Sequence, residues 1–225
     1  MKNNKNKKNI LLRLSFPATI VLLILLYWVI HIIFQYLGRE YEYIDDYYSI
    51  EEPIQIESQE ETTLNIDNKE LNVKLLYEYE ISGYVTATFS YLPYTLDNKV
   101  APKDITIVWG ELIKKDNLGH AKFYESGDRF VYAYFDEYLM NKYENIEHQF
   151  SHNHLIPSNK TIKKKIGKIR KGDYIHIKGY LAEVSYEDEN YSYSRGTSTS
   201  REDTGGTACE SIYVTEVTWL KEKKD

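Results

Sequence analysis

The sequence predicts a mainly β domain with one short helix, behind an N-terminal transmembrane helix. The chain of 225 residues contains 22 tyrosines against two methionines and five prolines, and such an aromatic load is typical of strands rather than helices. Apolar and polar residues alternate from Glu78 to Tyr91, which is the period of a half-buried strand. With one cysteine, the chain cannot form an internal disulfide, so its fold must depend on an apolar core.

The first element is an apolar segment near the N-terminus. Residues 16–37 carry no formal charge, and these 22 residues exceed the roughly 20 that cross a bilayer as a helix. A cleavable signal peptide has a shorter apolar core of roughly 7–15 residues, so we expect the segment to remain as a signal anchor. Residues 1–15 contain five basic and no acidic side chains, whereas acids dominate after the span. The positive-inside rule predicts a cytoplasmic N-terminal tail and an extracytoplasmic domain at the cell membrane.

Three polar or aromatic residues lie four positions apart within this span. Tyr27, His31 and Gln35 would share one face of the helix. We interpret them as interfacial residues near the outer membrane surface, although the same stripe could pair the helix with a neighbour in a membrane complex.

Residues 38–70 are expected to form an acidic stalk. Positions 39–62 contain nine acids and one base, with no sustained period of either regular structure. Removing residues 1–39 and their six bases leaves 22 bases against 34 acids, a formal charge of −12. Such a surface disfavours nucleic acid as a partner.

Residues 71–225 are expected to form the extracytoplasmic β domain. Gly83, inside the first strand, indicates a bend or a close backbone approach. A short amphipathic helix is expected after Ser158, its predicted cap. Four further strands are predicted at Ile105–Leu112, Phe130–Phe135, Tyr174–Val184 and Ile212–Leu220. The order of these elements favours an OB-like five-stranded barrel, the oligonucleotide/oligosaccharide-binding type, with a β-sandwich as the alternative.

A histidine cluster is the candidate metal site. If the chain around them is extended, His152 and His154 point the same way and offer two imidazoles to one metal, with His148 or Glu147 as a third ligand. The competing interpretation is that these are surface histidines at the end of a loop, and we favour it because no second cluster completes the ligand set.

Two features near the C-terminus also suggest a site. Cys209 could act as a nucleophile beside a histidine, but a lone cysteine before an apolar strand is more often a small buried hydrophobe. The polar segment Ser192–Glu210 is a long connection of the kind that often carries function. Its charged residues are candidate binding residues or could instead order the loop through ion pairs, and they are Arg195, Arg201, Asp203 and Glu210.

The chain contains three short motifs: His154-Leu155-Ile156-Pro157, then Ile169-Arg170-Lys171-Gly172-Asp173 with Gly179-Tyr180-Leu181, and finally Arg201-x-Asp203-Thr204-Gly205-x-x-Ala208-Cys209-Glu210. Together they resemble the motifs of a family of N-terminally membrane-anchored bacterial proteins without an assigned activity. The resemblance covers roughly the second half of the chain. It implies an anchored extracytoplasmic domain and no reaction.

The sequence thus predicts a single-pass, membrane-anchored binding protein of the cell envelope. We expect no catalytic residue and no cofactor, because neither a nucleophile with its base nor a complete metal shell is visible. The expected partner is another envelope protein or a glycan. The alternatives are a membrane-tethered metal-dependent hydrolase using the three histidines, and a structural subunit of a membrane complex.

Overall fold

The computed structural model describes residues 16–200, 202 and 208–223, and the chain divides into two compact units, Met1–Gly38 and Arg39–Asp225. In the first unit, helix α1 (Phe16–Tyr36) is long and apolar enough to cross a membrane. Such a helix is compatible with a membrane anchor or a signal sequence. The polar stripe lies on one face of α1 as expected, since the rings of Tyr27 and His31 stack and Gln35 Nε2 lies 3.1 Å from His31 Nε2.

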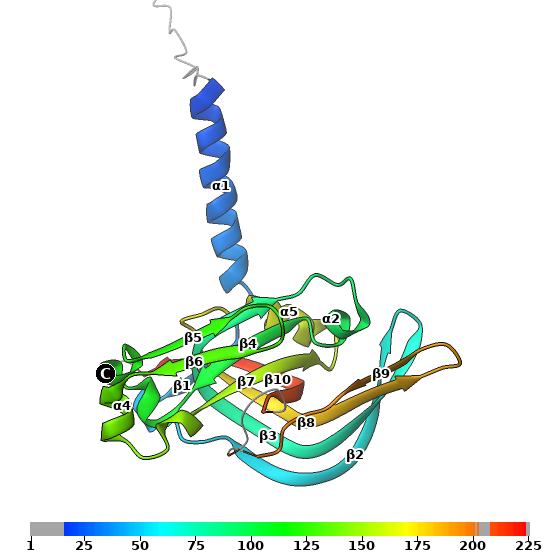
Figure 1. The fold of residues 1–225 in the computed structure, drawn as a ribbon. Helices are drawn as coiled ribbons and strands as arrows, with labels where there is room; N and C mark the ends of the chain where they lie inside the picture. The colour runs from blue at the N-terminus through cyan, green and yellow to red at the C-terminus, as the bar shows by residue number, and fades with distance from the viewer. Residues whose placement is uncertain (1–15, 201, 203–207, 224–225) are drawn as a thin grey trace, which may run out of the picture. The chain divides into compact units, whose positions relative to one another are not determined.

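The second unit is built on a closed ring of strands (Figure 1). Among the described residues, five strands form the ring, each pairing with the next and the last with the first: β3 (Lys69–Ser90), β4 (Lys103–Val108), β7 (Phe150–Pro157), β10 (Glu210–Glu222) and β8 (Tyr174–Glu187). The β7–β10 pair is parallel, and the other four are antiparallel. The predicted mainly β domain with a barrel-like core is confirmed.

The barrel encloses an apolar core. Ile81, Ile105, Leu155 and Trp219 are at most 2% exposed and belong to one buried cluster. Successive side chains of a strand point to opposite faces, so the neighbours of these core residues on β4 and β7 lie on the outer face of the ring. All six residues of β4 are buried, which shows that its outer face is covered as well.

A small hairpin covers this outer face. Strands β5 (Ala121–Glu125) and β6 (Val131–Phe135) form a separate two-stranded sheet. The rings of Phe123 and Phe135 both pack against Phe150 at the start of β7. The order of elements in the sequence predicts Phe130–Phe135 as the third barrel strand, but Val131–Phe135 form β6 of the hairpin, so that placement is wrong. The third barrel strand is β7, which was not predicted as a strand because its polar residues resemble a loop.

The predicted amphipathic helix is α5 (Lys160–Lys168), between β7 and β8. Its cap is Asn159 rather than Ser158, because the Asn159 side chain accepts hydrogen bonds from the backbone N–H groups of Thr161 and Ile162. The described unit also contains short helices and strand β9: η1 (Tyr47–Ser49), α2 (Leu96–Val100), η2 (Gly110–Ile113), α3 (Lys115–Leu118), α4 (Glu137–Lys142), η3 (Ile146–His148) and β9 (Ser192–Arg195).

The acidic segment 38–70 is not an extended stalk. Strand β1 (Tyr41–Ile44) pairs with β10. Strand β2 (Ile54–Ile66) pairs with β3 along most of the length of β2. Arg39 binds Asp173 through both carboxylate oxygens at 2.9 and 3.1 Å and lies over the ring of Trp219. The prediction of a stalk failed because apolar and polar residues alternate only weakly along edge strands, whose acidic side chains face solvent.

Two pairs of ring strands, β8 with β10 and β3 with β4, approach each other closely at a glycine. A Cβ on Gly179 would lie 2.1 Å from the carbonyl oxygen of Tyr213, and one on Gly83 would lie 2.3 Å from that of Val108. The close approach predicted at Gly83 is therefore present, and a second one occurs where β8 meets β10.

We expect Gly179→Ala to lower the free energy of unfolding by roughly 1–3 kcal/mol, because the methyl group would have to push two paired backbones apart. Gly167→Ala in α5 is the matched control, since a Cβ there meets no atom within 4 Å and alanine favours a helix. Chemical denaturation of both variants measures the difference. Equal stabilities would show that the ring is not tightly closed at Gly179.

Candidate functional site

A polar pocket of about 390 Å³ opens beside the barrel. It gathers side chains from segments far apart in the sequence: α2, the β5–β6 turn, β7, β9 with the residues that follow it, and the residue before β10. The lining residues are Asp97, Asp128, Arg129, Phe130, His154, Ser194, Arg195, Gly196, Thr197 and Cys209.

A chain of alternating charges forms one side of this pocket. Asp97 pairs with Arg195 and, at 3.0 Å, with Arg129. Arg129 also pairs at 2.9 Å with Asp104, which is fully buried on the outer face of β4. Because each of these four side chains lies beside one of opposite charge, they can remain ionised where they are shielded from water.

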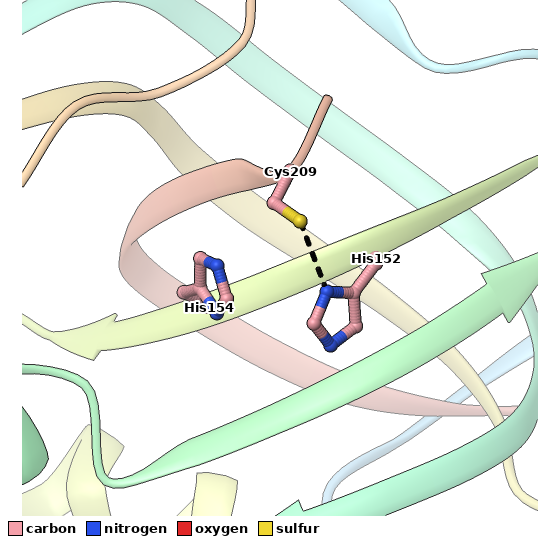
Figure 2. Close-up of side chains that lie close together, drawn as sticks. All are labelled: His152, His154 and Cys209. Carbon is pink, nitrogen blue, oxygen red and sulfur yellow. Dashed lines mark hydrogen bonds between the residues drawn. The ribbon is translucent and has the colours of Figure 1, made fainter. Parts of the chain in front are cut away.

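His154 and Cys209 of this lining, together with His152, bring three metal-binding atoms within 4.8 Å of one another (Figure 2). The two histidines are alternate residues of β7, so both rings lie on its outer face, with centroids 5.0 Å apart. Parallel pairing sets Glu210 opposite Asn153. The preceding residue, Cys209, thereby comes to lie with Sγ 3.2 Å from Nδ1 of His152.

Each histidine has a carboxylate near one ring nitrogen, which at His152 is the nitrogen that does not contact Cys209. Asp104 is directly opposite His154 in the β4–β7 pairing, and its Oδ1 lies 2.9 Å from Nδ1, at an angle outside that of a regular hydrogen bond. Glu125, from the covering hairpin, places Oε1 3.8 Å from Nε2 of His152. The same oxygen accepts a hydrogen bond from Thr106 at 2.9 Å.

Burial sets the protonation of this group. It lowers the pKa of His152 from 6.5 to about 4, with the nearby His154 adding to the effect. It raises the pKa of Glu125 from 4.5 to about 7. For Asp104, burial acts upward but is outweighed by His154 and Arg129, which hold the pKa below its ordinary value. At neutral pH His152 is therefore an uncharged imidazole.

This protonation state bears on the chemistry open to Cys209. A cysteine is activated as a nucleophile when a nearby imidazolium stabilises its thiolate, and an imidazole with a pKa near 4 stays neutral and is a weak base. A neutral imidazole is, however, the form that binds a metal ion. The arrangement therefore favours metal coordination over nucleophilic catalysis.

The structure brings together two of the three histidines predicted to form a site. His152 and His154 lie together at 3% and 5% exposure, so the interpretation of them as surface histidines is wrong. His148 lies in η3 and is not part of the three-residue group, in which Cys209 stands instead. Sequence spacing gave no signal for that third member, because Cys209 is distant along the chain.

Of the proposed binding residues of the Ser192–Glu210 segment, the two that the structure describes lie in different parts of the protein. Arg195 lines the pocket and makes the ion pair with Asp97, which is the loop-ordering role considered for it, and its binding role remains a prediction. Glu210 is buried at the start of β10. Arg201 and Asp203 lie outside the described residues. The described ends of the segment are joined by hydrogen bonds from Ser211 to Gly196 and Thr197.

No protein-family model, curated protein or solved structure matches this chain. The resemblance to membrane-anchored bacterial proteins therefore remains a prediction.

The raised pKa of Glu125 predicts a pH-dependent stability. A carboxyl whose folded pKa is raised contributes stability that is fully present below its unfolded value of 4.5 and is lost as pH rises through about 7. Glu125→Gln mimics the protonated form at every pH. In metal-free protein, the variant should therefore gain roughly 3 kcal/mol relative to wild type between pH 4.5 and 8.

Urea denaturation across this pH range tests the expectation, with the exposed Glu78→Gln as the control. A difference between Glu125→Gln and wild type that does not change with pH would mean that Glu125 titrates as an ordinary surface carboxyl.

Proposed function

We propose that this protein is a single-pass, membrane-anchored extracytoplasmic binding protein whose pocket takes a glycan of the cell envelope. The observation that carries the proposal is the polar pocket formed where several barrel connections meet. A rigid barrel that presents residues from its loops is a common arrangement for recognition.

The strand order supports an oligonucleotide/oligosaccharide-binding type of barrel. Such barrels have five strands and bind ligands through the connections between strands one and two and between strands four and five. The corresponding connections here are β3–β4, which contains Asp97, and β8–β10, which contains Ser194–Thr197. Both line the pocket, so the pocket lies where this type of barrel binds its ligands.

Charge and lining favour a sugar over a polyanion. The chain beyond residue 39 has a formal charge of −12, which opposes nucleic acid. Within the described pocket, Arg129 and Arg195 are neutralised by acids. Paired Asp and Arg side chains can bind hydroxyl groups, and the ring of Phe130, which is 42% exposed, offers an apolar face for a sugar.

The orientation rests on the basic residues before α1 and the acids after it. We expect a tag after Asp225 to be removed by protease added to intact cells or spheroplasts. Protection until lysis would reverse the orientation and would exclude envelope glycans as ligands.

The pocket is tested by Phe130→Ala, which removes an exposed ring without breaking an ion pair. Binding of full-length protein in detergent to cell-wall polysaccharide fragments should weaken about tenfold, the equivalent of roughly 1.4 kcal/mol. Tyr43→Ala on β1, which removes an exposed ring that does not line the pocket, is the control.

Equal binding by both variants and wild type would place the ligand elsewhere on the molecule. Absence of glycan binding, together with co-purification of an envelope protein that Phe130→Ala abolishes, would replace the glycan by a protein partner.

A further inference from the structure

We propose that His152, His154 and Cys209 bind a divalent transition-metal ion of the zinc class. Two imidazoles and one thiolate are donors of intermediate softness, which suit zinc and its neighbours, whereas calcium and magnesium require oxygen ligands. The proposed ligand group shares His154 and Cys209 with the lining of the glycan pocket, and the inference does not depend on which side of the membrane the domain faces.

The positions of the donor atoms fit such an ion. Sγ of Cys209 and Nδ1 of His152 are 3.2 Å apart, and the third donor lies within 4.8 Å of both. Because Nδ1 of His154 contacts Asp104, Nε2 is the nitrogen that remains for the metal. Zinc bond lengths of about 2.0–2.3 Å place the donors of a tetrahedral site roughly 3.3–3.6 Å apart. A movement of about 1 Å by one side chain would complete the geometry.

The surrounding carboxylates supply a second and independent observation. Histidines that bind metals commonly donate their other N–H to a carboxylate, which orients the ring and increases its basicity. Asp104 holds this position at His154, and Glu125 holds it at His152. Nε2 of His152 is buried without a hydrogen bond, as is Oε2 of Glu125. A metal on Nδ1 would make that N–H a stronger donor to Glu125.

The negative groups buried around the three ligands also favour a bound cation. A thiolate and Asp104 would surround the ion with negative charge, while the pocket arginines are already engaged by acids. Since His154 and Cys209 also line the pocket, the fourth coordination position would face it. Three protein ligands and one open position are the arrangement of metal sites that hold water or an exogenous ligand.

The test uses full-length protein in detergent, stripped of metal with a chelator and titrated with Co²⁺ and then Zn²⁺. We expect one Co²⁺ per chain, with the near-ultraviolet charge-transfer band of a thiolate ligand, and displacement by Zn²⁺. Because Cys209 is the sole cysteine, maleimide labelling reports directly on this thiol. Saturating Zn²⁺ should slow labelling at least tenfold, whereas Ca²⁺ and Mg²⁺ should leave the rate unchanged.

Variants separate this site from the three-histidine site expected from sequence. Cys209→Ser should abolish the charge-transfer band and weaken Co²⁺ binding, and His154→Gln should weaken binding at least tenfold. His148→Ala, the matched control, should behave as wild type. Glu125→Gln should keep the band and weaken binding by about 10–100-fold, as loss of a carboxylate behind a ligand does.

Two results would overturn the proposal: unprotected Cys209 at saturating Zn²⁺, or His148→Ala reducing Co²⁺ affinity as strongly as His154→Gln. The labelling rate and the Co²⁺ absorption band can be measured on the wild-type protein alone. These two measurements therefore test the proposal even where a variant fails to fold. They do not involve glycan binding, and failure of either proposal can therefore be recognised separately.

Discussion

The parallel pairing of β7 with β10 is the interaction on which the rest of this structure depends. Within the described residues it joins the third barrel strand to the last, and β10 in turn pairs with β8, which closes the ring. The same register sets Glu210 opposite Asn153 and so brings Cys209 to His152. A shift by one residue would turn the side chains of β10 to the opposite face, so closure of the barrel and assembly of the site share one constraint.

The β5–β6 hairpin has the complementary role of burying the outer face of that sheet. Without it, Asp104, Thr106 and both histidines would be ordinary surface residues of β4 and β7. With Phe123 and Phe135 packed on Phe150 and with Glu125 delivered from β5, these residues are buried, and the same burial raises the pKa of Glu125 and lowers that of His152. Burial of this kind is costly unless charges are paired. The chain of ion pairs from Arg195 through Asp97 and Arg129 to Asp104 meets this requirement.

These features connect the two proposals physically. His154 and Cys209 belong both to the pocket lining and to the three-residue group, so an ion bound by that group would have its open position toward the ligand. The acidic residues between 39 and 62, by contrast, serve mainly to build and solvate the edge strands. Arg39 ties the start of this unit to Asp173 and Trp219, so the folded domain begins directly after Gly38.

The sequence by itself determined the features that depend on local patterns: the apolar helix, the mainly β barrel-like domain, the long strand around Gly83 and the amphipathic helix before β8. It also indicated that His152 and His154 would share a face, because alternation is a property of any strand. The tertiary structure alone decided that residues 39–70 belong to the domain, that β7 replaces Phe130–Phe135 in the barrel, and that Cys209 joins the histidines. Each of these results depends on strand pairing between distant segments or on burial by a separate hairpin, and neither leaves a periodic signal in the residues concerned.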